Sequence, residues 1–477
     1  MKNLFLFCIL FTCTTKVLLS QTQVGQDING EEGDRLGYSV SISSDGNRVA
    51  IGSLNSNLNG LNSGVLKIYE WNGESWQQIG NSIYGESSTD QFAASISLSS
   101  DGNRVAVAAY RNNGNGISFG LVKIYQWSEN DWIQVGGDIE GKENDESIGR
   151  SIALSEKGDK IAITSEEKKG ISVYELKDEE WIRLGEVLYD NKRSNLRVDL
   201  SKDGNRLVVG DPLNGDNGTG TGAIQVYEWK DSTWVEMGGI IYGESGGDQF
   251  GFSVSISSNG KKVAVGSPYS KSSNDGAMSV YEWRDNSWNQ MGDFVYGRSS
   301  DERLGFSISI SSNGNRVAVG SPYRNNGRGR VQIYDFINEK WQPTNAPIEA
   351  DEGRVELGYS TSISFDGSKI AIGIPKSNGN GFYSGQVQVH GFLPVPIQNP
   401  LQENSIKIYP NPTRGKLFIS NHSSGTLKVI NKFGQKILEH KIKKTNSEIS
   451  ISNLPKGLYF LEVHYRNNYV IKKIIKH

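Results

Sequence analysis

Histidine and cysteine, the side chains that most often serve as nucleophiles, general bases or metal ligands, are nearly absent from this chain of 477 residues. The two cysteines are Cys8 and Cys13, and the five histidines all follow Val389. A Ser-His-Asp triad, a thiol nucleophile and a zinc site of His or Cys ligands are therefore excluded from residues 21–389. We expect no catalytic residues, no metal and no cofactor there, because only carboxylates, Tyr and Lys remain for acid–base chemistry.

Acidic side chains recur at one place in the sequence, two residues before an apolar residue that opens a strand pattern. They are Asp34, Asp90, Asp248 and Glu302. These carboxylates could surround a channel mouth and bind a cation or a polar ligand. We favour a structural role, because Asp in turns commonly accepts hydrogen bonds from backbone N–H groups. A hydrolytic enzyme would need a carboxylate pair that does not repeat.

Tyrosine and arginine, which recognition surfaces favour, occur in the variable loops. The pentapeptide Tyr-Arg-Asn-Asn-Gly begins at Tyr110 and again at Tyr323. The ligand-binding residues predicted from such loops are Tyr110, Arg111, Asp211, Tyr269, Tyr323, Arg324, Phe382 and Tyr383. The alternative is that one tyrosine per loop simply packs over the edge of its sheet.

A long repeat supplies the elements that position these residues. A sequence motif occurs seven times, and its type is Tyr-Ser-Val-Ser-Ile-Ser-Ser-Asp-Gly-Asn-Arg-Val-Ala-Ile-Gly. The glycines of successive turns are 46 to 56 residues apart. Alternating residues before an Asp-Gly or Asn-Gly turn predict a β-hairpin, and two further strands complete each unit. We expect tryptophan pairs such as Trp71 and Trp76 to pack blade against blade rather than stack sugars. Four-stranded units at this period predict a seven-bladed β-propeller in an all-β protein.

The seventh unit ends at Phe392 and has no fourth strand of its own. Residues 21–30, Gln-Thr-Gln-Val-Gly-Gln-Asp-Ile-Asn-Gly, match the fourth strand of the other units, such as residues 76–85. We therefore expect a propeller over residues 21–392, whose N-terminal segment completes the last blade by pairing with residues 386–390.

Phe250-Gly251 followed by Gly266-Ser267-Pro268 resembles the FG-GAP repeat of integrin α-subunit propellers. The resemblance covers residues 21–392. Blades of that family often carry a calcium loop with several Asp residues between the first two strands. Here a tight Ser-Ser-Asp-Gly-Asn-Arg turn fills that place and cannot offer the roughly six to eight oxygens that calcium takes. We therefore carry no metal site over from the family.

The first 20 residues have the pattern of a signal peptide for Sec export to the periplasm. Lys2 precedes the apolar run Leu4–Phe11, which is too short to span a bilayer, and Ser20 offers a small residue for cleavage. A lipoprotein attached through Cys13 is the alternative, although Phe11 and Thr12 fit that motif poorly.

The C-terminal segment differs from the rest of the chain in charge. A proline-rich linker is expected over residues 393–404, and residues 405–477 then carry 14 basic and 3 acidic side chains, a net charge of +11. Residues 21–404 have a net charge of −16. This asymmetry predicts two domains with different tasks, and the acidic larger domain would repel nucleic acid.

Short alternating strands over residues 405–477 predict a small Ig-like β-sandwich. Its motifs closely resemble those of the type A sorting domain of the type IX secretion system of Bacteroidota. The matching residues are Tyr409, Pro410, Asn411, Pro412, Gly415, Gly457, Tyr459, Lys472 and Lys473. The resemblance implies that the type IX machinery is a partner and that the protein reaches the cell surface or the medium. An accessory Ig-like domain is the alternative.

Three functions remain open. The first is a secreted or surface-attached, non-enzymatic binding and adhesion propeller with a glycan or protein ligand. The second is a carbohydrate-active or other hydrolytic propeller that uses two carboxylates, and the third is a structural surface protein without a specific ligand. We favour the first, with the ligand on the face that carries the variable loops, and expect the opposite face of tight turns to be uniform.

Overall fold

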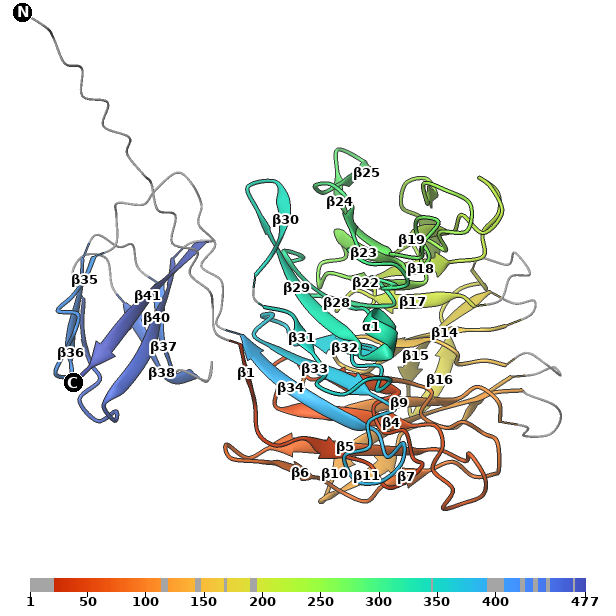
Figure 1. Cartoon of the computed structure of the whole chain (residues 1–477), viewed down its shortest axis with the longest axis horizontal. Coiled ribbons are helices and arrows are strands. Elements are labelled where there is room, and N and C mark those ends of the chain that lie inside the picture. The colour runs from red at the N-terminus through yellow and green to blue at the C-terminus, as the bar shows by residue number, and fades with distance from the viewer. Residues whose placement is uncertain are drawn as a thin grey trace, which may run out of the picture.

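The structure, a computed structural model, describes residues 21–112, 119–141, 147–166, 170–188, 195–344, 346–392, 407–420, 425–431, 436–442, 447–465 and 468–477. The signal peptide expected over residues 1–20 and the linker expected over residues 393–404 lie outside them. The fold is all-β, with a seven-bladed propeller and a small β-sandwich (Figure 1). Within the described ranges no helix is long and apolar enough to cross a membrane.

Each blade is an antiparallel sheet of four main strands, called A to D from the inside outwards, and in most blades a short strand continues D. The first three blades contain β3 (Ser39–Ile42), β4 (Arg48–Ser53), β5 (Val65–Trp71), β6 (Trp76–Gln78) and β7 (Ile83–Tyr84); β8 (Ser95–Leu98), β9 (Arg104–Ala109), β10 (Leu121–Ser128), β11 (Asp131–Gln134) and β12 (Ile139–Glu140); and β13 (Ile152–Leu154), β14 (Lys160–Thr164), β15 (Ile171–Lys177) and β16 (Glu180–Arg183).

The fourth to sixth blades contain β17 (Arg197–Leu200), β18 (Arg206–Asp211), β19 (Ala223–Lys230), β20 (Thr233–Glu236) and β21 (Ile241–Tyr242); β22 (Ser253–Ile256), β23 (Lys262–Ser267), β24 (Ala277–Arg284), β25 (Ser287–Gln290) and β26 (Val295–Tyr296); and β27 (Ser307–Ile310), β28 (Arg316–Gly320), β29 (Arg330–Ile337), β30 (Lys340–Pro343) and β31 (Ile348–Glu349). A single turn of helix, α1 (Arg324–Gly327), lies between β28 and β29.

The seventh blade is built from both ends of the propeller sequence. It contains β32 (Ser360–Ile363), β33 (Lys369–Ile374) and β34 (Gln386–Phe392), and β1 (Gln21–Gln23) and β2 (Ile28–Asn29) supply its outer strand. Gln23 pairs with His390 and Ile28 with Val387, so the red N-terminal segment lies beside the blue β34 in Figure 1. This is the pairing expected from the match between residues 21–30 and the other D strands.

The A strands surround a central channel. Each contacts the A strands of the two neighbouring blades, in the closed order β3, β8, β13, β17, β22, β27, β32 and back to β3. The alternation of β3 buries Val40 and Ile42 between blades and turns the serines at 39 and 41 to the other side. Strand B is buried on both faces because it lies between A and C inside the stack, and a Cβ on Gly52 would lie 2.2 Å from the Ala93 carbonyl oxygen of the next blade.

The repeated turn between strands A and B ties neighbouring blades together. In the first turn Asp45 accepts hydrogen bonds from the Ser43 hydroxyl (2.6 Å) and the Asn47 N–H (2.9 Å), and Gly46 has a φ of +66°. The basic residue that follows then donates to the turn of the next blade. The seven bridging residues are Arg48, Arg104, Lys160, Arg206, Lys262, Arg316 and Lys369. The Asp-Gly-Asn-Arg motif is therefore a structural device.

The tryptophans of strand D join the blades at the outer side, as expected. Trp76 packs against Trp71 with ring centroids 5.4 Å apart, and its indole N–H donates to the Val24 carbonyl oxygen of the neighbouring blade at 2.8 Å. The same bond between blades is made by Trp132, Trp181, Trp234, Trp288 and Trp341. These rings are part of the blade interfaces and are not free to stack sugars.

The two tryptophans of one hairpin offer a matched test of this bond. Trp76→Phe removes the indole donor and leaves the buried Val24 carbonyl without that hydrogen bond, so we expect a loss of about 1–2 kcal/mol in unfolding free energy. The indole N–H of Trp71 is buried without a partner among the described residues, so Trp71→Phe should cost clearly less. Denaturant melts of the two variants measure the difference, and equal losses would show that the bond between blades contributes nothing.

The C-terminal domain is a two-sheet sandwich. One sheet has the order β35 (Lys407–Tyr409), β36 (Lys416–Ser420) and β39 (Ser447–Ser450), and the other has the order β38 (Lys436–Ile442), β37 (Gly425–Asn431), β40 (Gly457–Tyr465) and β41 (Asn468–Lys476). Leu417 and Ile449 of the first sheet share a buried core with Leu427, Leu461 and Ile474 of the second. The expected Ig-like sandwich is confirmed.

Candidate functional site

Non-repeating side chains gather where the A strands begin, at the end of the channel that carries the D–A and B–C loops. Six of them stand two residues after the same buried apolar residue of their blades, and Arg197 opens the A strand of the fourth blade. The positions are Tyr38, Ala94, Arg150, Arg197, Phe252, Phe306 and Tyr359. We call these residues, without Ala94 but with Tyr269, Tyr323 and Arg303, the aromatic–arginine cluster.

Four rings of this cluster come from four adjacent blades and touch in sequence. The centroids of Tyr38 and Tyr359 are 4.9 Å apart, those of Tyr359 and Phe306 are 5.1 Å apart, and those of Phe306 and Phe252 are 5.0 Å apart. All four side chains are partly exposed. The propeller therefore presents a continuous aromatic arc around half of its axis.

Arginines continue the arc around the other half. The Arg197 guanidinium lies 5.5 Å from the Phe252 ring centroid, and it donates to the carbonyl oxygens of Asn195 and Leu196. Burial, and then the charge of nearby Arg150, lower the pKa of Arg197 to about 10. No described carboxylate forms a salt bridge with Arg197, whereas Arg150 pairs with Glu166 at 3.0 Å. This part of the cluster therefore holds a cation whose charge is not balanced by a direct partner among the described residues.

Two of the predicted ligand-binding residues join the cluster. The ring of Tyr323 meets Phe306 edge-on at 5.4 Å, and the ring of Tyr269 meets Phe252 at 6.1 Å. Arg303 lies over both tyrosines, at 4.3 Å and 5.1 Å from their centroids. Burial, helped by the charge of Glu356, raises the pKa of Tyr323 to about 12, so its hydroxyl stays protonated at neutral pH.

A third predicted tyrosine lies at the cationic end. The Tyr110 ring has the guanidinium of Arg111 5.6 Å from its centroid and that of Arg150 5.4 Å away, and its hydroxyl donates to Gln91. Tyr110 thus reaches the cluster through Arg150. Arg111 is exposed beside it.

The other predicted contacts do not join the cluster. Phe382 and Tyr383 stack on each other at 4.1 Å, with Phe382 exposed and Arg35 over Tyr383, as a separate aromatic pair. Arg324 forms ion pairs with Glu302 and Glu349. Asp211 is fully buried and accepts a hydrogen bond from the Leu213 N–H, so it cannot be a surface contact and that prediction was wrong.

The recurrent acids have the structural role that we favoured. Asp90 accepts hydrogen bonds from the N–H groups of Glu86 and Ser87 at 3.1 Å and 2.8 Å, and Asp34 and Asp248 each accept one such bond. Glu302 accepts two and also pairs with Arg330. Nowhere in the described ranges do three or more His, Cys, Asp or Glu side chains gather as a metal site would require.

A closed ring of backbone hydrogen bonds surrounds the opposite end of the channel. The residue before each A–B turn donates its N–H to the carbonyl oxygen of the equivalent residue in the next blade, at 2.7–3.1 Å, until the ring returns to its start. The seven members are Ser44, Ser100, Glu156, Lys202, Ser258, Ser312 and Phe365. Since only backbone atoms make these bonds, the ring does not depend on the seven side chains.

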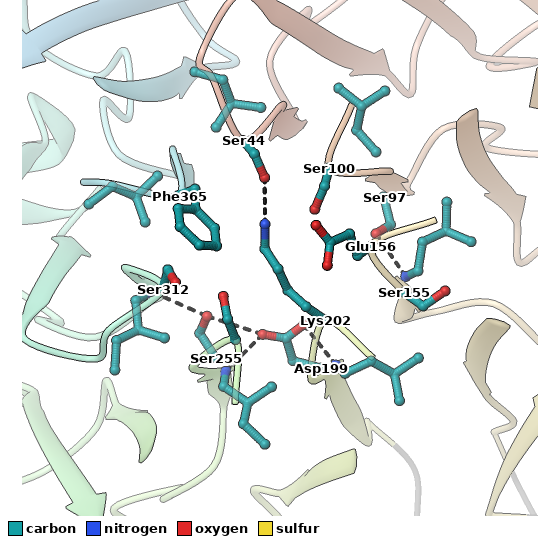
Figure 2. A pocket seen from close by; sticks show the side chains of 18 of the residues that line it. Ser44, Ser97, Ser100, Ser155, Glu156, Asp199, Lys202, Ser255, Ser312 and Phe365 are labelled. Carbon is teal, nitrogen blue, oxygen red and sulfur yellow. Dashed lines mark hydrogen bonds between the residues drawn. The ribbon is translucent and has the colours of Figure 1, made fainter. Parts of the chain in front are cut away.

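Three of those side chains depart from serine and line a cavity of about 170 Å³ (Figure 2). Lys202 extends across the channel and donates to the Ser44 hydroxyl at 2.6 Å, with its Nζ 3.9 Å from the Phe365 ring centroid. Burial lowers the pKa of Lys202, and the Glu156 carboxylate opposes that shift. We expected the face of tight turns to be uniform. The three departures from serine around the hollow at its centre show that this expectation was wrong.

Inside this ring the blades are also joined through side chains. A serine hydroxyl of strand A accepts the N–H of the next A strand at five of the seven interfaces, as Ser41 does from Leu98 at 3.0 Å. The third blade has Ala153 there, and Asp199 of the fourth blade compensates. One carboxylate oxygen accepts the Leu200 N–H at 2.9 Å and the other accepts the Ile256 N–H at 2.8 Å. Asp199 therefore joins the fourth blade to the fifth, and it also satisfies the Leu200 N–H, which finds no serine acceptor in the third blade.

This arrangement predicts a pH-dependent stability. Burial raises the pKa of Asp199 to about 6, although its hydrogen bonds oppose the shift. Between the unfolded pKa near 4 and about 6 the folded protein binds more protons than the unfolded chain, so the unfolding free energy falls as pH rises, by up to about 1.4 kcal/mol per pH unit. Asp199→Ser, which restores the repeat residue, should remove this slope in melts between pH 4 and pH 7. Parallel curves for the two proteins would contradict the assignment.

Sequence reasoning missed Glu156, Asp199, Lys202 and Phe365, as well as the four rings of the arc. The signal was present in the repeat. At the position before the turn, four units have serine and three do not. At the start of strand A, four units have an aromatic residue and the other three have Ala94, Arg150 and Val198. These sites are marked by residues that depart from the repeat at positions facing the axis. The departures can be seen in the sequence, but only the closed ring shows that these positions face the axis.

In the C-terminal domain the predicted sorting motifs come together. The Asn411 side chain donates to the Lys473 carbonyl oxygen at 2.7 Å and accepts the Ile475 N–H at 3.0 Å, which joins the Tyr-Pro-Asn-Pro motif to the terminal basic strand. Gly415 and Tyr459 are buried, and Pro410, Pro412 and Gly457 are exposed. Tyr409 is exposed as well, and Lys472 and Lys473 present charge to solvent.

Comparisons with known proteins agree with both domains. Residues 407–477 match the family model of the secretion system C-terminal sorting domain. No curated protein matches the chain. Among solved structures, the β-propeller domain of Cps50 (Swd1) from Myceliophteria thermophila is similar, with a TM-score of 0.51 and 12% identity over 78% of this chain and 98% of that one. At that identity the likeness shows the propeller fold alone.

Proposed function

Because the chain ends in a secretion system C-terminal sorting domain, we propose that it is cargo of the type IX system in a host of the Bacteroidota. On this proposal the protein crosses the inner membrane by Sec export and reaches the cell surface or the medium. The propeller then acts there as a non-enzymatic binding and adhesion module. The FG-GAP resemblance of its blades supports adhesion.

The observation that carries the binding proposal is the aromatic–arginine cluster. Aromatic rings and guanidinium groups are the usual anchors of recognition surfaces, because they combine a large contact area with directed polar groups. Here they come from six blades and converge on the axis, which no single blade requires for folding. A glycan or a protein segment that offers ring faces and acidic groups fits this combination.

The test is binding of the labelled full chain to a glycan array and to host cells. Tyr323→Ala removes an anchor ring and should weaken binding about tenfold or more, whereas Tyr323→Phe keeps the ring and should bind almost normally. Thr22→Ala, at an exposed position of β1 outside the cluster, is the control for surface binding. Melting curves show that each variant is folded. Equal binding by Tyr323→Ala and the unaltered protein would contradict the proposal, and no binding at all would favour a structural surface protein.

One observation favours hydrolysis as the second candidate function. Two carboxylates that do not repeat, those of Glu156 and Asp199, line the same cavity. Against a catalytic pair, both oxygens of Asp199 accept backbone hydrogen bonds, one of which joins the fourth blade to the fifth. Turnover of a defined glycoside that is abolished by Glu156→Gln would establish the hydrolytic function and refute the non-enzymatic one.

A further inference from the structure

We propose that the cavity at the A–B turn end of the channel is a second binding site, which takes a single sugar residue. The sugar is either a free monosaccharide or the terminal residue of a glycan. This site is separate from the aromatic–arginine cluster and does not depend on the function proposed for it.

The first argument is that folding does not require the side chains of this site. The ring before the A–B turns is made by backbone groups alone, and serine occupies four of its seven positions. Glu156, Lys202 and Phe365 make the same backbone bonds as those serines. Their side chains therefore bring a carboxylate, an ammonium group and an aromatic ring into the channel, and the ring of backbone hydrogen bonds does not need them.

The second argument is the combination of polar groups. The Lys202 ammonium has three N–H donors and uses one on the Ser44 hydroxyl, which leaves donors for a ligand. The Glu156 carboxylate makes no hydrogen bond or ion pair with any described residue, and Figure 2 shows it on the opposite side of the Lys202 chain from Phe365. The ammonium and the carboxylate face one cavity without pairing with each other. They suit a ligand with neighbouring hydroxyl groups, since each hydroxyl can donate to the carboxylate and accept from the ammonium.

The third argument is the aromatic platform. Phe365 lies at the channel mouth, where it is 44% exposed, and its ring forms one side of the cavity. The Lys202 ammonium covers part of the ring, and the rest is open to the C–H face of a pyranose, which aromatic rings accept through stacking and dispersion.

Size and charge narrow the ligand further. The cavity measures about 170 Å³, and an engineered cavity of about 150 Å³ accepts one six-membered ring. Two carboxylates and one ammonium line it, so an anion such as phosphate would meet a net negative charge. A neutral ligand of one ring that carries hydroxyl groups satisfies both limits.

The experiment is saturation-transfer NMR on the full chain with glucose, galactose, mannose and N-acetylglucosamine, together with their methyl glycosides. Glu156→Ser, Lys202→Ser and Phe365→Ser each restore the residue of the other blades and should therefore fold. Each is expected to raise the dissociation constant at least tenfold, while Phe365→Tyr and Thr22→Ala, at an exposed position of β1 outside both sites, leave it within about twofold. Methyl glycosides that bind as well as free sugars identify a glycan terminus, and free sugars alone identify a monosaccharide site.

Two results would overturn the proposal. One is the absence of saturation transfer to every sugar from a folded protein. The other is binding that survives all three serine variants. Displacement of a bound sugar by inorganic phosphate at equal concentration would likewise count against a neutral ligand.

Discussion

A protein that lacks residues 21–30 is expected to melt at least about 5 °C below the intact protein. The deletion removes β1 and β2, and with them the outer strand of the seventh blade. Val24 and Ile28 are 8% and 4% exposed and pack in a core with Trp76 and Val389, so their loss alone removes about 4 kcal/mol of burial. It also removes the hydrogen bonds from Val24 to Val389 and from Gly30 to Gly385.

The effect should be larger than these contacts suggest, because a propeller is a closed ring. Without β1 the edge of β34 is unpaired, and exposed strand edges invite aggregation. Trp76 loses its acceptor at Val24 in the same step. Differential scanning calorimetry of the deletion variant measures the shift.

Control variants show whether the loss of stability comes from the buried contacts of this segment. Thr22→Ala changes an exposed residue of β1 and should leave the melting temperature unchanged, whereas Val24→Ser with Ile28→Ser should reproduce much of the loss. A synthetic peptide of residues 21–30 should restore part of the stability of the deletion variant. An unchanged melting temperature after deletion would show that the ring does not need this segment.

Truncation after Pro400 is expected to abolish export while leaving the propeller folded. The truncated chain keeps all seven blades, because the strands of the propeller end with β34 at Phe392. It loses the domain that matches the sorting family, so it should accumulate in the periplasm of the native host instead of at the surface or in the medium. Cell fractionation with an antibody against the propeller measures the distribution, and a melting curve tests the fold.

Point variants make this result specific to the sorting domain. Asn411→Ala breaks two hydrogen bonds between the Tyr-Pro-Asn-Pro motif and β41, and should reduce export strongly. Asn453→Ala, at an exposed position of the same domain, should not. Normal surface appearance of the truncated chain would refute the role of the domain as an address.

Much of the architecture could be predicted because local signals agree with one another. Each Asp-Gly or Asn-Gly turn fixes a hairpin, and each hairpin repeats at a nearly constant spacing. Four-stranded units of that period have few ways to bury their faces other than against one another. The closing strand could be predicted for the same reason, since residues 21–30 carry the pattern of strand D without a unit of their own.

The candidate sites were harder to predict, and the difference lies in what brings their residues together. Tyr269 and Tyr323 were found from their loops, but the rings that they touch, Phe252 and Phe306, had the pattern of ordinary strand residues. Asp211 was placed in a loop surface and is buried. The alternation of residues along a strand indicates on which side of the strand a residue lies. It does not indicate which residue of another blade lies opposite.

The sequence by itself determined the all-β class, the seven units, their closure and the sorting motifs, because these follow from turns, alternation and short motifs that act over a few residues. Only the tertiary structure decided which side chains meet on the axis. Phe365 of the seventh blade meets Ser44 of the first through a ring that needs all seven blades, and Lys202 reaches Ser44 across 158 positions of sequence. Such contacts depend on closure of the whole ring, since the axis exists only once the last blade has joined the first.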